Sequence, residues 1–144
     1  MMSSPDLARA RASSGDIGYS RKVEDSRGRY VVFCKATFPS ELTLDGLKIV
    51  VDGAHGAGYR VGPSVFEELG AKVFAIHTNP NGININAGCG AAMPQNLVEE
   101  VKRNSADFGI ALDGDGDRLV MVDSAGMIYD GDQLLYVIAR DYQR

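Results

Sequence analysis

Apolar residues along the chain fall into two alternating patterns, one typical of strands and one of helices. Short apolar runs rich in β-branched residues predict buried strands at residues 47–52, 71–77 and 108–112. Helical spacing marks the segments between them, the first over 61–69 with Gly70 as its stop and the second opening at Pro94. The side chains expected to face the sheet are Val65, Phe66, Leu69, Leu97, Val98 and Val101. This order predicts a parallel sheet with right-handed crossovers.

Further elements are expected at both ends of this pattern. A helix is predicted over 26–37, with Ser26 as its candidate N-cap and Pro39 beyond its end. An apolar strand at 119–122 follows the third strand so closely that it should pair antiparallel with it. Asp130 and Gln133 have capping-box spacing for a last helix, whose packing residues are expected to be Leu134, Leu135, Val137 and Ile138. The predicted fold is α/β, a three-layer mixed, mainly parallel sheet with helices on both faces.

The chain divides into a short tail and one domain. Residues 1–18 are rich in Ser, Ala, Arg and Gly and lack an apolar period, which is typical of a linker or a disordered tail. Residues 19–144 form the predicted domain, because a chain of 144 residues has room for a single core.

Composition narrows the classes of partner. The formal net charge of -4 argues against nucleic acid, although the first thirty residues are locally basic. No apolar stretch is long enough to cross a membrane, and the amino terminus lacks the layout of a secretion signal, so a soluble cytoplasmic protein is expected. Cys34 and Cys89 are too few for a disulfide framework or a zinc site, and both are expected to be reduced thiols.

The strongest chemical signal is the run Asp113-Gly114-Asp115-Gly116-Asp117-Arg118, directly after the third predicted strand. Three like charges this close repel one another and are most readily held together by a bound cation. The two glycines leave room for alternate side chains to converge on one ion, and ligands bind at this edge of open α/β sheets. The residues predicted to bind a magnesium-type ion are Asp113, Asp115 and Asp117, with Arg118 facing an anion such as a phosphoryl group.

Other interpretations of this run are weaker. In a helix-loop-helix calcium site, positions six and twelve of the loop would be Gly and Glu, whereas here they are Arg118 and Ser124. A solvated acidic turn would leave the repulsion between the carboxylates uncompensated. Arg118 could also pair internally with the same aspartates instead of with an external anion.

The aspartate run and its surroundings resemble the metal-binding loop of the α-D-phosphohexomutases. The resemblance extends from about Gly18 to the carboxyl terminus, and it is closest to the branch that interconverts glucosamine 6-phosphate and glucosamine 1-phosphate. Supporting segments are residues 33–35, 48–57, 79–86, 88–90, 111–118, 120–123 and 130–133. The chain therefore resembles the second, metal-binding domain of that family.

The resemblance implies a function for the intact enzyme. Members of the family move a phosphoryl group between the 6- and 1-hydroxyls of a hexose phosphate, through a phosphoserine and a bisphosphorylated intermediate. A magnesium ion would lie between that phosphoserine and Asp113, Asp115 and Asp117, and Arg118 would bind the phosphate. The expected partners are a hexosamine phosphate and the missing domains of the same chain.

The family's phosphoserine, sugar-recognition loop and phosphate-binding loop lie in other domains and are not recognisable here. Ser13 and Ser14 lack the sequence context of the nucleophile, so no catalytic residue is assigned, and this segment alone is expected to be inactive. Two alternatives remain open at this point. One is a phosphomannomutase or phosphoglucomutase domain with the same loop, and the other is a non-catalytic divalent-metal-binding interaction module.

Four smaller features carry structural expectations. Residues 53–58 are expected to form a tight turn, because their glycines lack the spacing of a phosphate-binding loop, and His55 within them is expected to be structural. His77 is expected to be a partly buried imidazole with a backbone partner. Residues 79–86, rich in Asn, predict a structured loop. The turn and cap residues, rather than metal ligands, are expected to be Asp123, Asp130 and Asp132.

Overall fold

The computed structural model describes residues 12–143, in which helices and strands alternate as far as the third strand and two further strands and a helix follow. The elements in chain order are α2 (Ser26–Lys35), β1 (Lys48–Asp52), α3 (Val61–Glu68), β2 (Lys72–Ile76), α4 (Gln95–Asn104), β3 (Phe108–Leu112), β4 (Leu119–Asp123), β5 (Ile128–Tyr129) and α5 (Gly131–Asp141).

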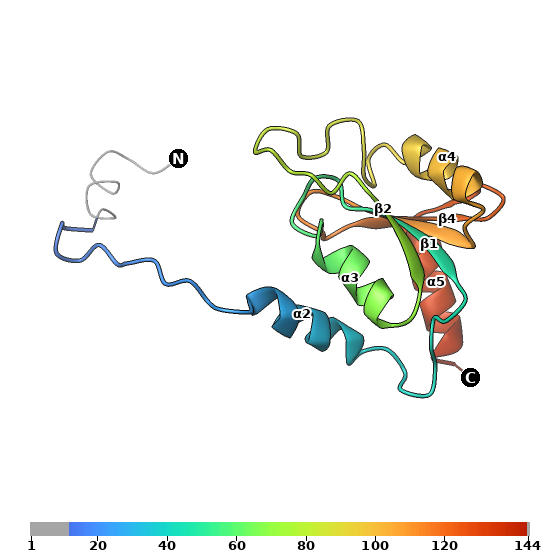
Figure 1. The fold of residues 1–144 in the computed structure, drawn as a ribbon, viewed down its shortest axis with the longest axis horizontal. Coiled ribbons are helices and arrows are strands. Elements are labelled where there is room, and N and C mark those ends of the chain that lie inside the picture. Colours follow the sequence, from blue (N-terminus) through green and yellow to red (C-terminus); the bar gives the residue numbers. More distant parts are fainter. Residues whose placement is uncertain (1–11, 144) are drawn as a thin grey trace.

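The strands form one open mixed sheet in the order β2-β1-β3-β4-β5. β1 pairs in parallel with β2 and β3, whereas β4 pairs antiparallel with β3 and with β5. Helix α3 covers one face of the parallel strands, with α2 packed against it, and α4 covers the opposite face (Figure 1). The predicted three-layer α/β fold with a mixed sheet is confirmed.

Each face of the parallel strands has its own hydrophobic core. Under α4, Val50 and Val122 pack against Leu97 and Val101 of the helix. Under α3, the core contains Ile49, Val51, Ala71 and Ile110, with Phe66 of the helix packed against them. Strand β1, which lies between β2 and β3, is therefore buried on both faces, which is why its sequence is a continuous apolar run and not an alternating one.

Two local predictions differ from the structure. Asp25, in the left-handed conformation with φ 53°, is the N-cap of α2, so the prediction of Ser26 as N-cap is wrong and Ser26 is the first helical residue. Strand β5 was not predicted, because two residues are too short to carry an alternating pattern.

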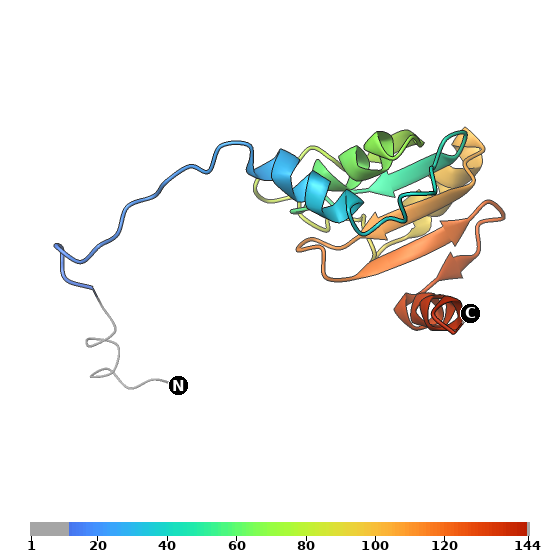
Figure 2. The same cartoon turned by 90° about the horizontal axis from the view of Figure 1, so that it is seen from below.

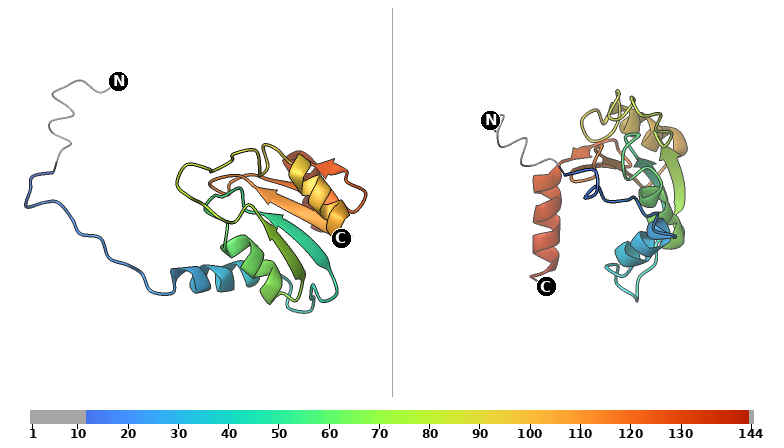
Figure 3. Two further views of the ribbon diagram at one scale, coloured as in Figure 1. Left: turned by 45° about the horizontal axis from the view of Figure 1, so that its top comes forward. Right: turned by 90° about the vertical axis from the view of Figure 1, so that its left-hand side faces the viewer.

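Helix α5 begins as predicted but packs differently. The Gln133 N–H donates to the Asp130 carboxylate and the Gln133 side chain accepts from the Asp130 N–H, both at 3.0 Å, which completes the capping box. The predicted packing of its apolar residues is wrong, because Leu135, Val137 and Ile138 are more than half exposed. The helix stands off from the sheet beyond β5 (Figures 2 and 3).

The amino-terminal segment carries no helix or strand over residues 12–23 and is exposed there. It extends away from the sheet before α2 begins (Figure 3). The predicted tail at 1–18 lies partly outside the described residues, and its boundary stays a prediction. Within residues 12–143, no helix is both long and apolar enough to span a membrane.

Candidate metal centre

The aspartate loop, residues 113–118, connects β3 to β4 at the carboxyl end of the parallel strands. One carboxylate oxygen from each of Asp113, Asp115 and Asp117 lies within 4.8 Å of the others. Asp113 is buried, whereas Asp115 and Asp117 are exposed. The structure thus brings all three predicted ligands together, with an oxygen donor set that suits a hard divalent cation.

Asp113 is the fixed member of this group. Its Oδ1 accepts the backbone N–H groups of Gly116 and Arg118 at 3.1 Å, and its Oδ2 accepts Nε of Arg118 at 2.9 Å. Burial alone would raise the pKa of the Asp113 carboxyl, but the bonds from Arg118 outweigh it and the pKa lies below its usual range. Asp113 therefore stays ionised and shapes the loop.

The pKa values of Asp117 and Arg118 are also shifted by neighbouring charges. The carboxylate of Asp115, followed by that of Asp113, raises the pKa of Asp117. A cation between these carboxylates would relieve that repulsion. Arg118 forms the internal ion pair that was one of its two interpretations, and its bond to Asp113 raises the pKa of the guanidinium. Its side chain is still 80% exposed, so it remains within reach of an external anion.

Two other segments, residues 53–58 and the turn at Ala91, bond to the backbone of the aspartate loop and of the strand before it. Residues 53–58 form the predicted tight turn, closed by the Gly56 N–H donating to the Gly53 carbonyl at 2.8 Å. The Ala57 N–H then donates to the Gly114 carbonyl at 2.8 Å, and Gly56 and Gly114 lie so close that a Cβ on Gly56 would overlap the Gly114 backbone. On the other side, the Ala91 N–H donates to the Leu112 carbonyl at 2.9 Å.

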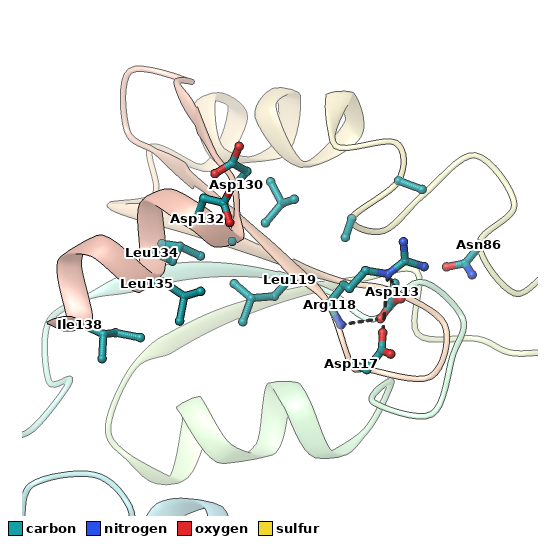
Figure 4. Close-up of a pocket in the computed structure, with 14 residues that line it drawn as sticks. Asn86, Asp113, Asp117, Arg118, Leu119, Asp130, Asp132, Leu134, Leu135 and Ile138 are labelled. Carbon is teal, nitrogen blue, oxygen red and sulfur yellow. Dashed lines mark hydrogen bonds and ion pairs between the residues drawn. The ribbon is translucent and has the colours of Figure 1, made fainter.

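An open groove of about 580 Å³ runs from the aspartate loop toward α5 (Figure 4). Asp113, Asp117 and Arg118 line its polar end. Its other end is lined by the apolar residues Leu119, Leu134, Leu135 and Ile138, together with Asp130 and Asp132 at the start of α5. A ligand that placed a phosphoryl group beside the loop would therefore have room to extend along this groove.

A second group of side chains lies at the carboxyl ends of β1 and β2. Asp52 is fully buried and accepts the N–H groups of Ala54 at 2.8 Å and Gly90 at 2.9 Å. Nδ1 of His77 lies 3.0 Å from Oδ2 of Asp52, so the predicted backbone partner of this imidazole is wrong. Cys89 is buried beside them as a free thiol, and burial, followed by the charge of Asp52, raises its pKa.

Sequence reasoning missed this second group, because its members come from three separate segments. The only local signal is that Asp52 and His77 each stand directly at or after the end of an apolar strand, where functional side chains gather in α/β sheets. His55, from the turn after β1, accepts the Asn79 N–H through Nδ1 at 3.2 Å, in keeping with its predicted structural role.

The remaining polar residues behave as predicted. Asp123 accepts the N–H groups of Ala125 and Met127 and the Tyr129 hydroxyl, which fixes the turn between β4 and β5. Asp130 caps α5, and Asp132 lies in the first turn of that helix. Within residues 79–86, side chains of Asn81 and Asn84 bond to the loop's own backbone, so this segment is a structured loop.

The fold and the loop define a class of protein, an α/β domain with a cluster of carboxylates that could hold a metal ion at the carboxyl edge of its sheet. The chain belongs to the phosphoglucomutase/phosphomannomutase family, whose alpha/beta/alpha domain II matches residues 29–126. The resemblance to the phosphohexomutases is thereby confirmed.

Individual relatives point to one branch of that family. The chain is 58% identical over 132 residues to the phosphoglucosamine mutase of Cupriavidus taiwanensis, and 59% identical over 133 residues to that of Dechloromonas aromatica. Each match covers 92% of this chain but only 30% of the relative. The chain therefore spans about a third of the length of these relatives.

A solved structure supports the fold. The crystal structure of a phosphoglucomutase/phosphomannomutase family protein from Burkholderia thailandensis superposes with a TM-score of 0.68 at 30% identity. The match covers 82% of this chain and 26% of that protein. The domain thus has the same architecture as one part of a longer protein of its family.

Proposed function

We propose that this chain is the magnesium-binding domain of a phosphoglucosamine mutase, which interconverts glucosamine 6-phosphate and glucosamine 1-phosphate. The observation that carries the proposal is the convergence of three carboxylates at the end of β3, in a chain 58% identical to a protein of that name. The identity to phosphoglucosamine mutases also favours this sugar over the mannose and glucose phosphates of other family members.

Asp113, Asp115 and Asp117 would hold the ion. Their oxygen atoms fit magnesium, which prefers a small number of carboxylates together with water and phosphate oxygens. Bound magnesium would neutralise charge on a transferring phosphoryl group and hold its oxygens for in-line displacement. The protein's own contribution is to place two exposed carboxylates beside a third that is buried and held ionised.

Arg118 would position the phosphoryl group. Its backbone N–H and its Nε are already bonded to Asp113, which holds one edge of the guanidinium, while the side chain as a whole is 80% exposed and lines the groove beside Asp117. A planar guanidinium binds phosphate oxygens in a defined orientation. Arg118 and the metal would thus approach one phosphoryl group from neighbouring positions.

The segment alone is proposed to be catalytically incomplete. Transfer requires a phosphoserine and sugar-binding groups that the resemblance places in other domains of the enzyme. Incubating the chain with glucosamine 1-phosphate and the 1,6-bisphosphate activator should therefore give no glucosamine 6-phosphate. Turnover by this chain alone would overturn the claim of incompleteness.

Metal binding can be tested directly by titrating magnesium or manganese into the protein by calorimetry. We expect Asp115→Asn to weaken binding at least about tenfold, because it removes a charged ligand without touching the buried Asp113. Asp141→Asn is the matched control, since it makes the same charge change on an exposed residue of α5. Equal binding by wild type and Asp115→Asn would remove the aspartate loop from the site.

A further inference from the structure

We propose that Asp52, His77 and Cys89 form a second metal site, suited to a borderline ion such as Zn²⁺ and distinct from the magnesium-type aspartate loop. The three side chains lie at the carboxyl ends of β1 and β2 and in the turn that follows residues 79–86. They share no ligand with the aspartate loop. The site would therefore bind its ion independently of Asp113, Asp115 and Asp117.

The donor atoms are already close together. One Asp52 carboxylate oxygen, one His77 ring nitrogen and the Cys89 sulfur all lie within 4.8 Å of one another. Ligands at bond lengths of about 2.0 to 2.3 Å around a tetrahedral zinc ion are separated by roughly 3.5 Å. Small side-chain movements would bring the three donor atoms to these separations, without rearrangement of the strands that carry them.

His77 presents an atom that its protein neighbours leave without a hydrogen bond. Nδ1 is buried and lies 3.0 Å from Oδ2 of Asp52, yet no aligned hydrogen bond joins them or satisfies that nitrogen within the described residues. The bonding direction of the nitrogen therefore passes beside the carboxylate oxygen. An ion ligated by both atoms would satisfy Nδ1, as buried polar atoms generally require.

Asp52 also has the charge that such an ion would compensate. It is fully buried, and among the described residues no Lys or Arg pairs with its carboxylate, whose one basic neighbour is the His77 imidazole. Buried carboxylates are ordinarily paired with a cation or bound to a metal. The bonds from Ala54 and Gly90 occupy part of each oxygen and fix the carboxylate in place, as supporting bonds do around metal ligands.

The types of donor select the ion. A thiolate, an imidazole and a carboxylate together suit zinc or cobalt, whereas magnesium prefers oxygen ligands alone. Asp52, Cys89 and Nδ1 of His77 are buried, and the 25% exposure of the His77 side chain comes from its other atoms. A zinc ion here would have three protein ligands and one further position for water.

Cobalt(II) provides the test, because thiolate ligation to cobalt produces a near-ultraviolet charge-transfer absorption that carboxylate ligation does not. The full chain, reduced and freed of metal with a chelator, is titrated with CoCl₂ in the wild type and in Asp115→Asn. We expect the absorption to saturate at one cobalt per chain in both proteins. Zinc added afterwards should abolish it by displacement.

Two ligand variants separate the proposal from adventitious binding. Cys89→Ser should remove the charge-transfer absorption, and His77→Asn should weaken cobalt binding at least about tenfold. Cys34→Ser, at the other free thiol, is the matched control and should leave the absorption unchanged. Circular dichroism of each variant establishes that it is folded.

Three results would overturn the site. One is wild-type protein that takes up cobalt without the charge-transfer absorption, since wild type needs no assumption about folding of a variant. Another is absorption that disappears in Cys34→Ser and persists in Cys89→Ser. The third is cobalt affinity that His77→Asn leaves unchanged. Loss of magnesium binding in Asp115→Asn with cobalt binding intact would show that the two sites are independent, whereas loss of both would contradict that independence.

Discussion

Asp52 and Asp113 are both buried carboxylates at the ends of parallel strands that lie side by side, yet they organise the chain over different distances. Among residues 12–143, the donors to the Asp113 carboxylate all come from its own loop, from Gly116 and Arg118. The aspartate loop is therefore built locally, and its shape depends on residues that are adjacent in the sequence.

Asp52 instead connects segments that are far apart. It accepts the Ala54 N–H in the turn after β1 and the Gly90 N–H from 38 positions further along the chain, and it lies 3.0 Å from Nδ1 of His77 at the end of β2. The segments that these turns begin bond to the backbone of the aspartate loop at Gly114, through Ala57, and to Leu112 just before it, through Ala91. The comparison teaches that the aspartate loop is a local structure, whereas the two segments that contact it, residues 53–58 and the turn at residues 90–91, depend on the buried carboxylate of Asp52 for their arrangement.

The largest expected effect is that of replacing these two carboxylates in turn. Asp52→Ala leaves two buried N–H groups without an acceptor, which should cost about 3 kcal/mol, whereas the part-buried donors around Asp113 can turn to water, so Asp113→Ala should cost about 1 kcal/mol. Urea unfolding with a chelator present measures both. Equal losses would contradict the distinction between a long-range and a local carboxylate.

Gly56→Ala tests whether the turn at residues 53–58 supports the aspartate loop. A Cβ there would lie 2.6 Å from the Gly114 Cα, a backbone atom that cannot move away without moving the aspartate loop. We expect a loss of about 2 kcal/mol in the free energy of unfolding, together with weaker magnesium binding. Gly131→Ala, where a Cβ meets no atom within 4 Å, is the matched control: it should leave magnesium binding unchanged and, at the first position of α5, raise the free energy of unfolding by no more than about 1 kcal/mol. Wild-type magnesium affinity in Gly56→Ala would show that the two loops are independent.

A smaller effect is expected on the acid side. Because the folded-state pKa of Asp113 is lowered, its stabilisation is complete above the ordinary carboxyl value of about 3.9 and is lost as pH falls through the lower, folded-state pKa. Asp113→Asn cannot lose this contribution, so its stability should fall less steeply than that of the wild type between about pH 5 and pH 2. Asp123, whose pKa is also lowered, is common to both proteins and cancels in the difference. Parallel curves from urea unfolding would contradict a depressed pKa at Asp113.

The same contrast explains what the sequence could predict. The aspartate loop was predictable because its ligands, its glycines and Arg118 occupy consecutive positions after a strand that its apolar run identifies. Asp130 and Gln133 likewise predicted the start of α5, because a capping box is a local structure.

What depended on distant segments was not predictable. Nothing near Asp52 in the sequence indicates His77 or Cys89, and their meeting follows from strand order and from a long loop. The exposure of Leu135 and Val137 was missed for the same reason, since helical spacing shows which residues share a face but not what that face packs against.

The smallest change in the free energy of unfolding is expected for Asp115→Asn, although the same substitution should weaken magnesium binding strongly. Asp115→Asn removes an exposed carboxylate that raises the pKa of Asp117, so it relieves repulsion and should change the free energy of unfolding by no more than about 0.5 kcal/mol, in the direction of greater stability. Thermal unfolding without metal, compared with Asp141→Asn, measures this change. With magnesium present, Asp141→Asn should become the more stable of the two variants, because only a protein that binds the ion gains stability from it. A variant that is destabilised without metal would mean that Asp115 supports the loop itself, and the division between a binding carboxylate and a structural one would then fail at this position.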